Sequence, residues 1–418
     1  SPTSASSHDV SQGHEIIAAF MIQALRSRGV TTSRDAWCYN SSSSALLKNV
    51  ETTINFYNSE LARWEAFGSE ANALEDFVRV DLTQISWGGD ILKHLSRGEA
   101  LSVDPTRVVQ SVYRPFFKSW LYFDRILNNR IYQMPKMFPS AEASNRVIMV
   151  SGVGAKTFTP FMVDAIPCLD LIEKGQCYPL TVYDDDGSSS ASLFDEGQGG
   201  GEGTGRHGVS DAGLAYFSNA YPREKISKDD IFYYVYGLLH STEYRSLYGD
   251  SLSKELPRIP CVKQAEDFWR FTEAGRALAD LHVNYECADP WPVTIKEGDL
   301  RLADIKNPKT FYRVTKMKFA KSGKEVDKTT VVYNANITMQ DIPLEAYDYV
   351  VNDRSALEWV MERQAVKTDK ASGIVNDANR YAIEGMDNPA YPLELFQRVI
   401  TVSMETLKIV RGLPALDI

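Results

Sequence analysis

Aromatic and cationic side chains alternate along residues 113–139, and their types point to nucleic-acid chemistry. The stretch has five cations against a single acid, Asp124, so its net charge is +4 in a chain whose total is −10. Cations position phosphates, exposed planar rings stack on bases, and Arg or Asn reads base edges. The candidate contacts are Arg114, Lys118, Arg125, Asn128, Arg130 and Lys136. The alternative, which residue chemistry alone favours, is a core strand and turn with cationic stems lying over aromatic rings.

A second basic stretch covers residues 306–328, where eight cations outnumber two acids and give a net charge of +6. YRVTKMKFA predicts a strand, KSGKEVDK a hairpin tip and TTVVYNANITM the returning strand. A lysine-rich hairpin suits contacts with DNA phosphates, and it equally suits an edge strand protected against aggregation. The candidate phosphate contacts are Lys316, Lys318, Lys321 and Lys324.

Three further lysines lie in predicted loops. The segment SGVGAK at 151–156 lacks the Walker spacing, so we interpret it as a glycine turn between strands, from which Lys156 can touch a phosphate. The segment VKTDKASGIVNDANRY, from residue 366, predicts a polar loop that carries Lys367 and Lys370.

The sequence patterns around these residues predict both helices and strands. We therefore expect an α+β fold, with helical layers around one or two small, mainly antiparallel sheets. Short aromatic or β-branched runs between residues 108 and 184 predict strands. Apolar residues at helical spacing predict helices over 14–28, 45–67, 89–100, 211–222, 228–256, 266–286 and 392–413, and two short helices within 344–366. Gly, Ser and acidic residues predict a mobile loop over about 185–208, with His207 solvated.

Long ordered blocks of this sequence resemble a known family. They include RDAWCYN, YRPF, WLYFDR, NRVIMVSGVGAKTF, DIFYYVYGLLHSTEYR and VVNDRSALEWVMERQAVKTDKASGIVNDAN. Together they resemble the carboxy-terminal target-recognition region of type ISP restriction–modification enzymes. In that family a single chain carries a nuclease, a helicase-like motor, an adenine-N6 methyltransferase and a target-recognition domain.

The resemblance implies sequence-specific recognition of double-stranded DNA, in partnership with methyltransferase and helicase/nuclease domains of the same polypeptide. It implies a helical connector over 1–107, a recognition domain over 108–300, and a basic hairpin with C-terminal helices over 301–418. S-adenosylmethionine, ATP and Mg²⁺ would belong to the other domains. The alternative is a scaffold that docks a methyltransferase or motor and contacts DNA only incidentally.

The sequence lacks the motifs that would make this chain an enzyme by itself. It has no NPPY motif, no Walker motif, no GxSxG elbow and no HExxH motif. Its five cysteines have no CxxC spacing, so we expect neither a zinc site nor a disulfide framework, and a bacterial cytoplasm fits best. No apolar run reaches the length of a membrane span. We therefore expect no catalytic residues, no metal and no cofactor in this chain, and no membrane partner.

Overall fold

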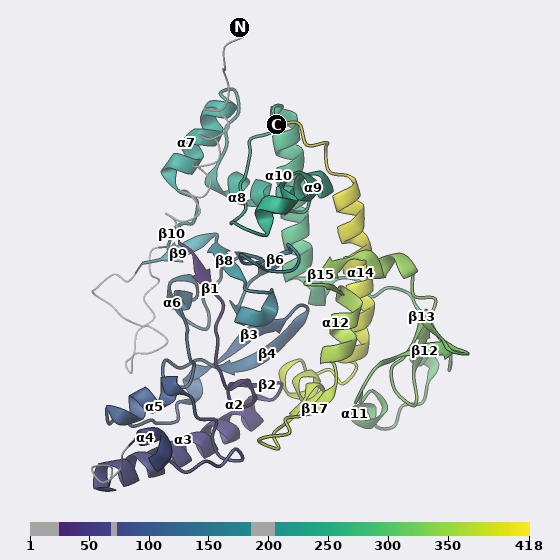
Figure 1. Ribbon diagram of the computed structural model, residues 1–418. Helices are drawn as coiled ribbons and strands as arrows, with labels where there is room; N and C mark the ends of the chain where they lie inside the picture. Colours follow the sequence, from purple (N-terminus) through teal and green to yellow (C-terminus); the bar gives the residue numbers. More distant parts are fainter. Residues whose placement is uncertain (1–24, 68–72, 185–204) are drawn as a thin grey trace.

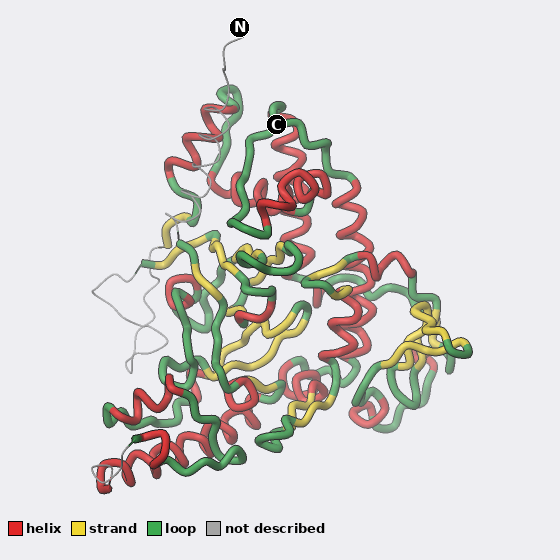
Figure 2. Tube along the Cα trace, viewed as in Figure 1, coloured by secondary structure: helices red, strands yellow, loops and turns green. Residues whose placement is uncertain are grey.

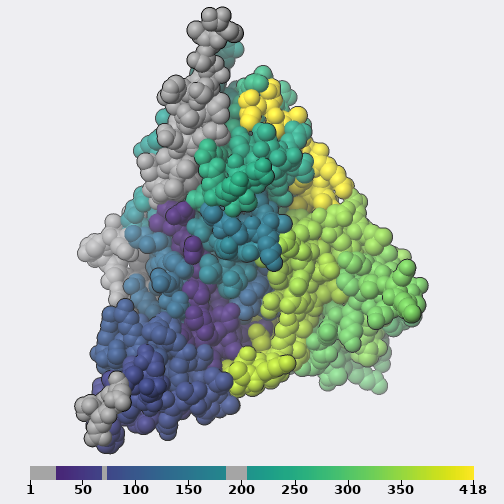
Figure 3. Space-filling model, viewed as in Figure 1, coloured from purple at the N-terminus to yellow at the C-terminus, as the bar shows by residue number. Residues whose placement is uncertain are grey.

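The computed structural model describes residues 25–67, 73–184 and 205–418. Its outline is triangular, with corners at the α7–α10 helices, the α3–α5 helices and the β12–β13 hairpin (Figures 1 and 3). Helices surround several small sheets, most of them antiparallel (Figure 2). The predicted α+β class is confirmed. The described residues form three four-stranded sheets, more than the one or two expected.

The first sheet has the order β2-β4-β3-β7 and contains the aromatic and cationic stretch. Its strands are β2 (Tyr39–Asn40), β3 (Val108–Arg114), β4 (Phe117–Tyr122) and β7 (Ile166–Pro167). β3 and β4 form a tight hairpin whose turn residue Phe116 has a φ of 56° and is fully buried. Among the paired strands of this sheet, only β3 and β7 run parallel. The alternative interpretation of a core strand and turn therefore describes residues 113–122 of this stretch.

The second sheet, in the order β1-β8-β5-β6, separates two hydrophobic cores. Its strands are β1 (Ser27–Arg28), β5 (Val147–Val150), β6 (Pro160–Val163) and β8 (Gln176–Pro179). Side chains alternate between the two faces of a strand. Along β5, Val147 and Met149 accordingly enter the larger core, while Ile148 and Val150 enter the smaller one. SGVGAK connects β5 to β6, which confirms the predicted turn between strands.

The helices of the N-terminal layer cover one end of the first sheet. They are α2 (Asp35–Cys38), α3 (Ser43–Phe67), α4 (Leu74–Phe77) and α5 (Gly89–Ser96). Arg34 is almost fully buried and joins this layer to the β4 side, because its guanidinium pairs with Asp90 at 2.8 Å and also donates to the Leu127 carbonyl oxygen. The long predicted helix over 45–67 is confirmed as α3.

The smaller core is helical and covers the second sheet. Its helices are α7 (Asp211–Ala220), α8 (Lys228–Leu239), α9 (Thr242–Leu252) and α10 (Ala265–Val283). Ser227 and Asp230 form a capping box at the start of α8. α8 and α10 approach closely at Gly237 and Gly275, where a Cβ on Gly275 would lie 1.8 Å from the Tyr233 carbonyl oxygen. The aromatic side chains of α8 are buried.

The third sheet, in the order β11-β14-β13-β12, contains the lysine-rich hairpin. Its strands are β11 (Thr294–Ile295), β12 (Lys318–Ser322), β13 (Glu325–Val332) and β14 (Thr338–Gln340). The predicted hairpin is confirmed, although β12 begins only at Lys318 and the two-residue turn is Gly323–Lys324. Gly323 has a φ of 64°, which suits the glycine of a hairpin turn. β12 is the edge strand of this sheet.

The C-terminal part crosses back over the first sheet. It contains β15 (Val350–Val351), β16 (Arg354–Ser355), α12 (Ala356–Arg363), β17 (Val366–Thr368), β18 (Val375–Asp377), α13 (Ala378–Arg380), the π-helical turn Tyr381–Gly385 and α14 (Tyr391–Arg411). Shorter elements elsewhere are α6 (Met134–Met137), α11 (Pro308–Phe311), β9 (Thr181–Tyr183), β10 (Gly205–His207) and the 3₁₀ turns Pro105–Arg107, Leu169–Leu171, Tyr285–Cys287, Leu300–Leu302 and Leu344–Asp348.

Three local predictions need correction. Most of the helix expected over 14–28 lies outside the described residues, but Ser27–Arg28 is a strand that pairs with Gln176–Cys177. Residues 185–204 of the expected mobile loop also lie outside the described residues. Residues 205–207 instead pair with β9, and His207 Nε2 lies 2.6 Å from Asp229. The polar loop from residue 366 contains the β17–β18 hairpin, because backbone pairing satisfies its polar main chain.

Candidate nucleic-acid interface

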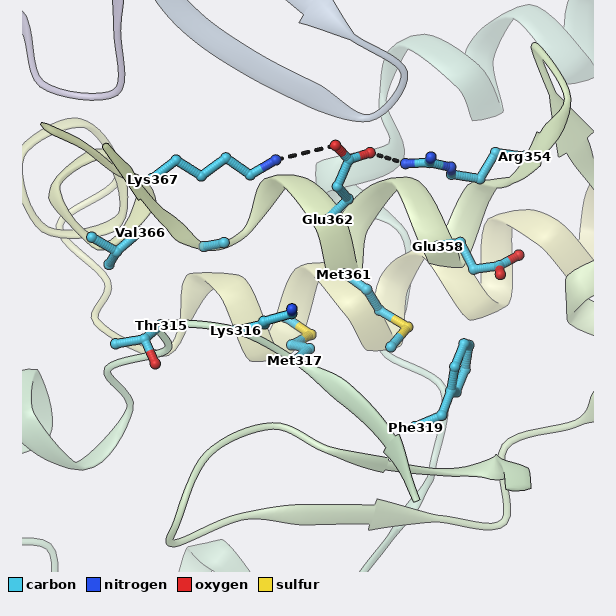
Figure 4. A pocket seen from close by; sticks show the side chains of 11 residues that line it. Thr315, Lys316, Met317, Phe319, Arg354, Glu358, Met361, Glu362, Val366 and Lys367 are labelled. Atoms are coloured by element: carbon cyan, nitrogen blue, oxygen red, sulfur yellow. Dashed lines mark hydrogen bonds and ion pairs between the residues drawn. The ribbon is translucent and has the colours of Figure 1, made fainter. Parts of the chain in front are cut away.

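Three cations pair with the carboxylate of Glu362, near the C-terminal end of α12, and the charges of two more, Arg114 and Lys316, act on these cations from nearby. We call Arg114, Lys316, Arg354, Arg363, Lys367 and Glu362 the Glu362 cluster. Glu362 pairs with Arg354 through one oxygen, and through the other with Lys367 at 3.1 Å and Arg363 at 3.5 Å. Figure 4 shows Arg354 and Lys367 reaching Glu362 from opposite directions. One carboxylate cannot neutralise five cations, so the cluster has excess positive charge.

Arg354 is presented by a tight hairpin turn that precedes α12. Asn352 and Asp353 both have positive φ values, 52° and 65°, which is the pattern of a two-residue hairpin loop favoured by Asn and Asp. The Asn352 side chain accepts a hydrogen bond from the Glu173 N–H at 3.1 Å, which ties this turn to the second sheet. The Arg354 guanidinium lies 4.8 Å from the Trp359 ring centroid. The turn and the ring together fix the direction of Arg354.

Lys316 and Lys367 are brought together by one backbone hydrogen bond. The Val366 N–H donates to the Thr315 carbonyl oxygen at 3.0 Å, which links the start of β17 to the segment that leads into β12. The next residue on each segment is a lysine, and the charge of Lys316 acts on Lys367. Residues 51 positions apart in sequence thus become neighbours.

Arg114 and Arg363 share the ring of Tyr113. Their guanidinium carbons lie 4.1 Å and 5.6 Å from its centroid, and the Tyr113 hydroxyl donates to Asp35 at 2.9 Å. Aromatic faces attract cations, so Tyr113 holds two like charges close together. Sequence reasoning assigned this ring a role in base stacking or in the core, but its contacts identify it as a support for the two arginines.

Burial and neighbouring positive charge lower the pKa of two of these side chains. Burial, with a further contribution from Arg363, Arg354, Arg114 and Lys316, lowers the pKa of Lys367 to about 8. Burial, and next the charge of Arg114, lowers the pKa of Arg363 to about 10. Perturbed ionisation of this kind is concentrated at functional sites. An anion bound here would relieve the repulsion.

A cavity of about 560 Å³ opens beside the cluster, between α12 and the β12–β13 hairpin. It is lined by Thr315, Lys316, Met317, Phe319, Arg354, Glu358, Met361, Glu362, Ala365, Val366 and Lys367. Figure 4 shows Arg354, Glu362 and Lys367 along one side of α12, and Lys316, Met317, Met361 and Phe319 on its side toward the hairpin. The cavity therefore has a charged edge and an apolar edge.

The structure brings three of the predicted contact residues into the cluster: Arg114, Lys316 and Lys367. The β12–β13 hairpin adds Lys318, Lys321 and Lys324, all exposed, and Lys370 is exposed in the β17–β18 connection. Arg125, Arg130 and Lys136 follow β4, and Lys156 lies in the β5–β6 connection; none of the four lines the cavity. Of these four, Lys136 is half-buried and the others are exposed.

Two predicted contact residues have internal partners instead. The Lys118 side chain is only 10% exposed, and its ammonium nitrogen lies 2.9 Å from a carboxylate oxygen of Glu286. Asn128 is buried, where it accepts from the Asp124 N–H at 3.0 Å and donates to the Tyr122 carbonyl oxygen at 3.1 Å. Both side chains stabilise the first sheet and its following turn.

Arg354, Arg363 and Glu362 were missed because residues 353–363 contain three acids and two cations, so a local charge count shows no excess of cations. The sequence feature that could have identified Arg354 is the preceding Asn352–Asp353 pair, which is typical of a tight turn.

Within the described residues, no group of His, Cys, Asp and Glu side chains is arranged to hold a metal ion. No helix in the described ranges has the length and apolarity needed to cross a bilayer.

Comparisons with known proteins agree with this description. A family model described as type ISP C-terminal specificity domain matches residues 21–395. The fold is similar to a nuclease-deletion mutant of the type ISP restriction-modification enzyme LlaGI in complex with a DNA substrate mimic, with a TM-score of 0.77 and 33% identity. It is also similar to the ATP-dependent type ISP enzyme LlaBIII bound to DNA, with a TM-score of 0.78 and 33% identity.

A third similar structure is a DrdV–DNA complex, with a TM-score of 0.73 and 30% identity. Each of the three alignments covers 94% of this chain. The chain spans 33% of the LlaGI chain, 23% of the LlaBIII chain and 36% of the DrdV chain. A search of curated proteins finds no match.

Proposed function

Because this chain belongs to the family of type ISP C-terminal specificity domains, we propose that it recognises a short asymmetric sequence in double-stranded DNA. The observation that carries the proposal is the convergence of Arg114, Lys316 and Lys367 on the Glu362 cluster from three distant segments. The related LlaGI, LlaBIII and DrdV structures are DNA complexes, which supports DNA as the partner.

The two basic regions would have different tasks in this recognition. Phosphate contacts set the register of a protein on a duplex, whereas contacts with base edges provide specificity. The Glu362 cluster is held by rings, a turn and a backbone hydrogen bond, so it suits a phosphate contact of fixed geometry. The exposed hairpin, with Lys318, Lys321 and Lys324, has the width of a two-stranded ribbon, which the major groove admits.

Catalysis would be performed by other parts of a longer polypeptide. The chain spans about a third of the LlaGI chain, and its sequence has no NPPY or Walker motif. We propose that bound target DNA is delivered to an adenine-N6 methyltransferase or to an ATP-dependent nuclease and motor. S-adenosylmethionine, ATP and Mg²⁺ would bind in those domains. Residues 1–107 would connect the recognition module to them, and such a protein would work in the bacterial cytoplasm.

Selection of bound duplexes from a random pool, at two salt concentrations, tests the proposal. Enrichment of one short asymmetric sequence, with affinity falling as salt rises, is the expected result. Absence of binding at low salt, repeated with a full-length type ISP polypeptide that contains this chain, would contradict it and favour the scaffold alternative. Binding without enrichment would limit the role of the chain to phosphate contact and overturn its sequence specificity.

A further inference from the structure

The cavity beside the Glu362 cluster is larger and less polar than a phosphate site requires. Its volume of about 560 Å³ falls in the range of about 300–1,000 Å³ that is typical of small-molecule sites. A phosphate held by Arg354 and Lys367 would occupy only the charged edge beside Glu362. The remaining space borders Met317, Phe319 and Met361.

The apolar edge suits a flat heterocycle. Met side chains are flexible and polarizable, and their sulfur atoms make favourable contacts with aromatic rings. The Phe319 ring is itself held by Tyr347, with ring centroids 5.7 Å apart, and by the Lys328 ammonium, 5.5 Å from the Phe319 centroid. This edge is therefore a supported surface on which a planar group can lie.

The cavity also contains hydrogen-bond acceptors suited to a base. Glu358 is fixed by Ser355, whose hydroxyl donates to its carboxylate at 2.6 Å and accepts from its backbone N–H at 3.2 Å. A fixed carboxylate beside an apolar surface can accept from the exocyclic amino group of adenine, cytosine or guanine. Cations for a phosphate, an apolar surface for a ring and an acceptor for an amino group thus line one cavity.

We propose that this cavity binds one nucleotide, with its phosphate on the Glu362 cluster and its base against Met317, Phe319 and Met361. The inference rests on the proposed DNA function when the nucleotide is one that leaves the stack of the target duplex. The ligand has two possible sources: an unstacked nucleotide of the target DNA, or a free mononucleotide, which has the same chemistry. Unstacking of a nucleotide is known wherever an enzyme must reach a base.

Methyl NMR of the 418-residue chain labelled at its methionines distinguishes these sources. The chain has ten methionines; Met317 and Met361 line the cavity, and Met162 is buried in the smaller core as a reference. Met317→Leu and Met361→Leu identify the two signals. The probes are inorganic phosphate, the four 2′-deoxynucleoside monophosphates and the duplex recovered by selection. A bound base displaces both methyl signals by its ring current, which inorganic phosphate lacks.

If both the mononucleotides and the duplex displace the methyl signals of Met317 and Met361, the cavity is a nucleotide site that accepts either source. Displacement by the duplex alone assigns the site to an unstacked DNA nucleotide. If the duplex binds but neither it nor any mononucleotide displaces the two signals, the nucleotide site is overturned while DNA recognition stands. Equal effects of phosphate and mononucleotides would overturn the base contact. If no duplex binds, the proposed DNA recognition is contradicted. The mononucleotide titration then tests by itself whether the cavity binds a nucleotide.

A cavity-filling variant gives a second readout. Thr315 lines the cavity and is exposed, so Thr315→Trp occupies the space without disturbing a packed core. Thr310→Trp is the matched control, because Thr310 is exposed on α11 and does not line the cavity. Loss of one stacked base predicts about tenfold weaker duplex binding for Thr315→Trp than for the control. Equal affinities of the two variants would contradict the proposal.

Discussion

The Lys367 ammonium nitrogen lies 3.1 Å from one carboxylate oxygen of Glu362, and the other oxygen pairs with Arg354. Glu362 thus holds two cations from different hairpins at opposite ends of one carboxylate. Arg363 also reaches it, and Arg114 and Lys316 contribute positive charge nearby. A DNA phosphate entering this cluster would meet donors that are already oriented.

Neutralising Glu362 should strengthen DNA binding and weaken its selectivity. Glu362→Gln keeps the size of the side chain but removes the negative charge that competes with phosphate. We expect tighter binding to unrelated duplexes and a salt slope steeper by up to about 0.9, equivalent to one phosphate contact. Filter-binding or anisotropy titrations at several salt concentrations measure both quantities. Unchanged affinity and slope would show that Glu362 does not limit access of phosphate to the cations.

Proton uptake should accompany DNA binding near pH 8. Burial and neighbouring cations lower the pKa of Lys367 to about 8, so the free protein loses this proton as pH rises through that value. Phosphate binding favours the charged ammonium and raises its pKa. Affinity should therefore fall above pH 8, by up to about tenfold per pH unit, and stay nearly constant below pH 7. Lys367→Gln should remove this pH dependence; its persistence in the variant would assign it to another group.

The Lys118–Glu286 pair should contribute to stability and leave DNA binding unchanged. Both side chains are largely buried, so Lys118→Met leaves the Glu286 charge without its partner, at a cost of about 3–5 kcal/mol in the free energy of unfolding. Lys118→Met combined with Glu286→Gln should recover much of that loss. Urea unfolding measures the stability. A variant with full stability and a reduced salt slope would instead place Lys118 on the DNA.

The hairpin lysines should affect DNA affinity without affecting the fold. Lys321 and Lys324 are exposed, and surface substitutions usually change stability by no more than about 0.5 kcal/mol. Replacing both with Gln should reduce the salt slope by up to about 1.8, equivalent to two phosphate contacts. If the slope is unchanged but the variant aggregates, the lysines protect the edge strand β12 instead.

The sequence predicted elements well where a pattern was long and local. The helix over 45–67 follows from apolar spacing. The hairpin turn at Gly323 was placed within a few residues. Such features depend on neighbours in sequence, so they are readable without tertiary contacts.

The site was harder to predict because its geometry depends on distant partners. Lys316 and Lys367 meet through a hydrogen bond between Thr315 and Val366, and no local pattern encodes that pairing. Lys118 and Lys367 have the same residue type, but only the fold shows that one is largely buried beside Glu286 and the other is about half-exposed beside Glu362. Their difference lies in tertiary surroundings and not in composition.

The most direct test of the central claim compares the Arg354→Gln/Lys367→Gln double variant with Lys263→Gln. Lys263 is an exposed control that pairs with Asp417 near the C-terminus. The measurement is the dependence of duplex affinity on salt concentration for the wild-type chain and both variants. We predict a loss of affinity and a shallower slope in the double variant, with Lys263→Gln matching wild type. Identical slopes in all three, with the double variant folded, would show that the Glu362 cluster does not contact DNA.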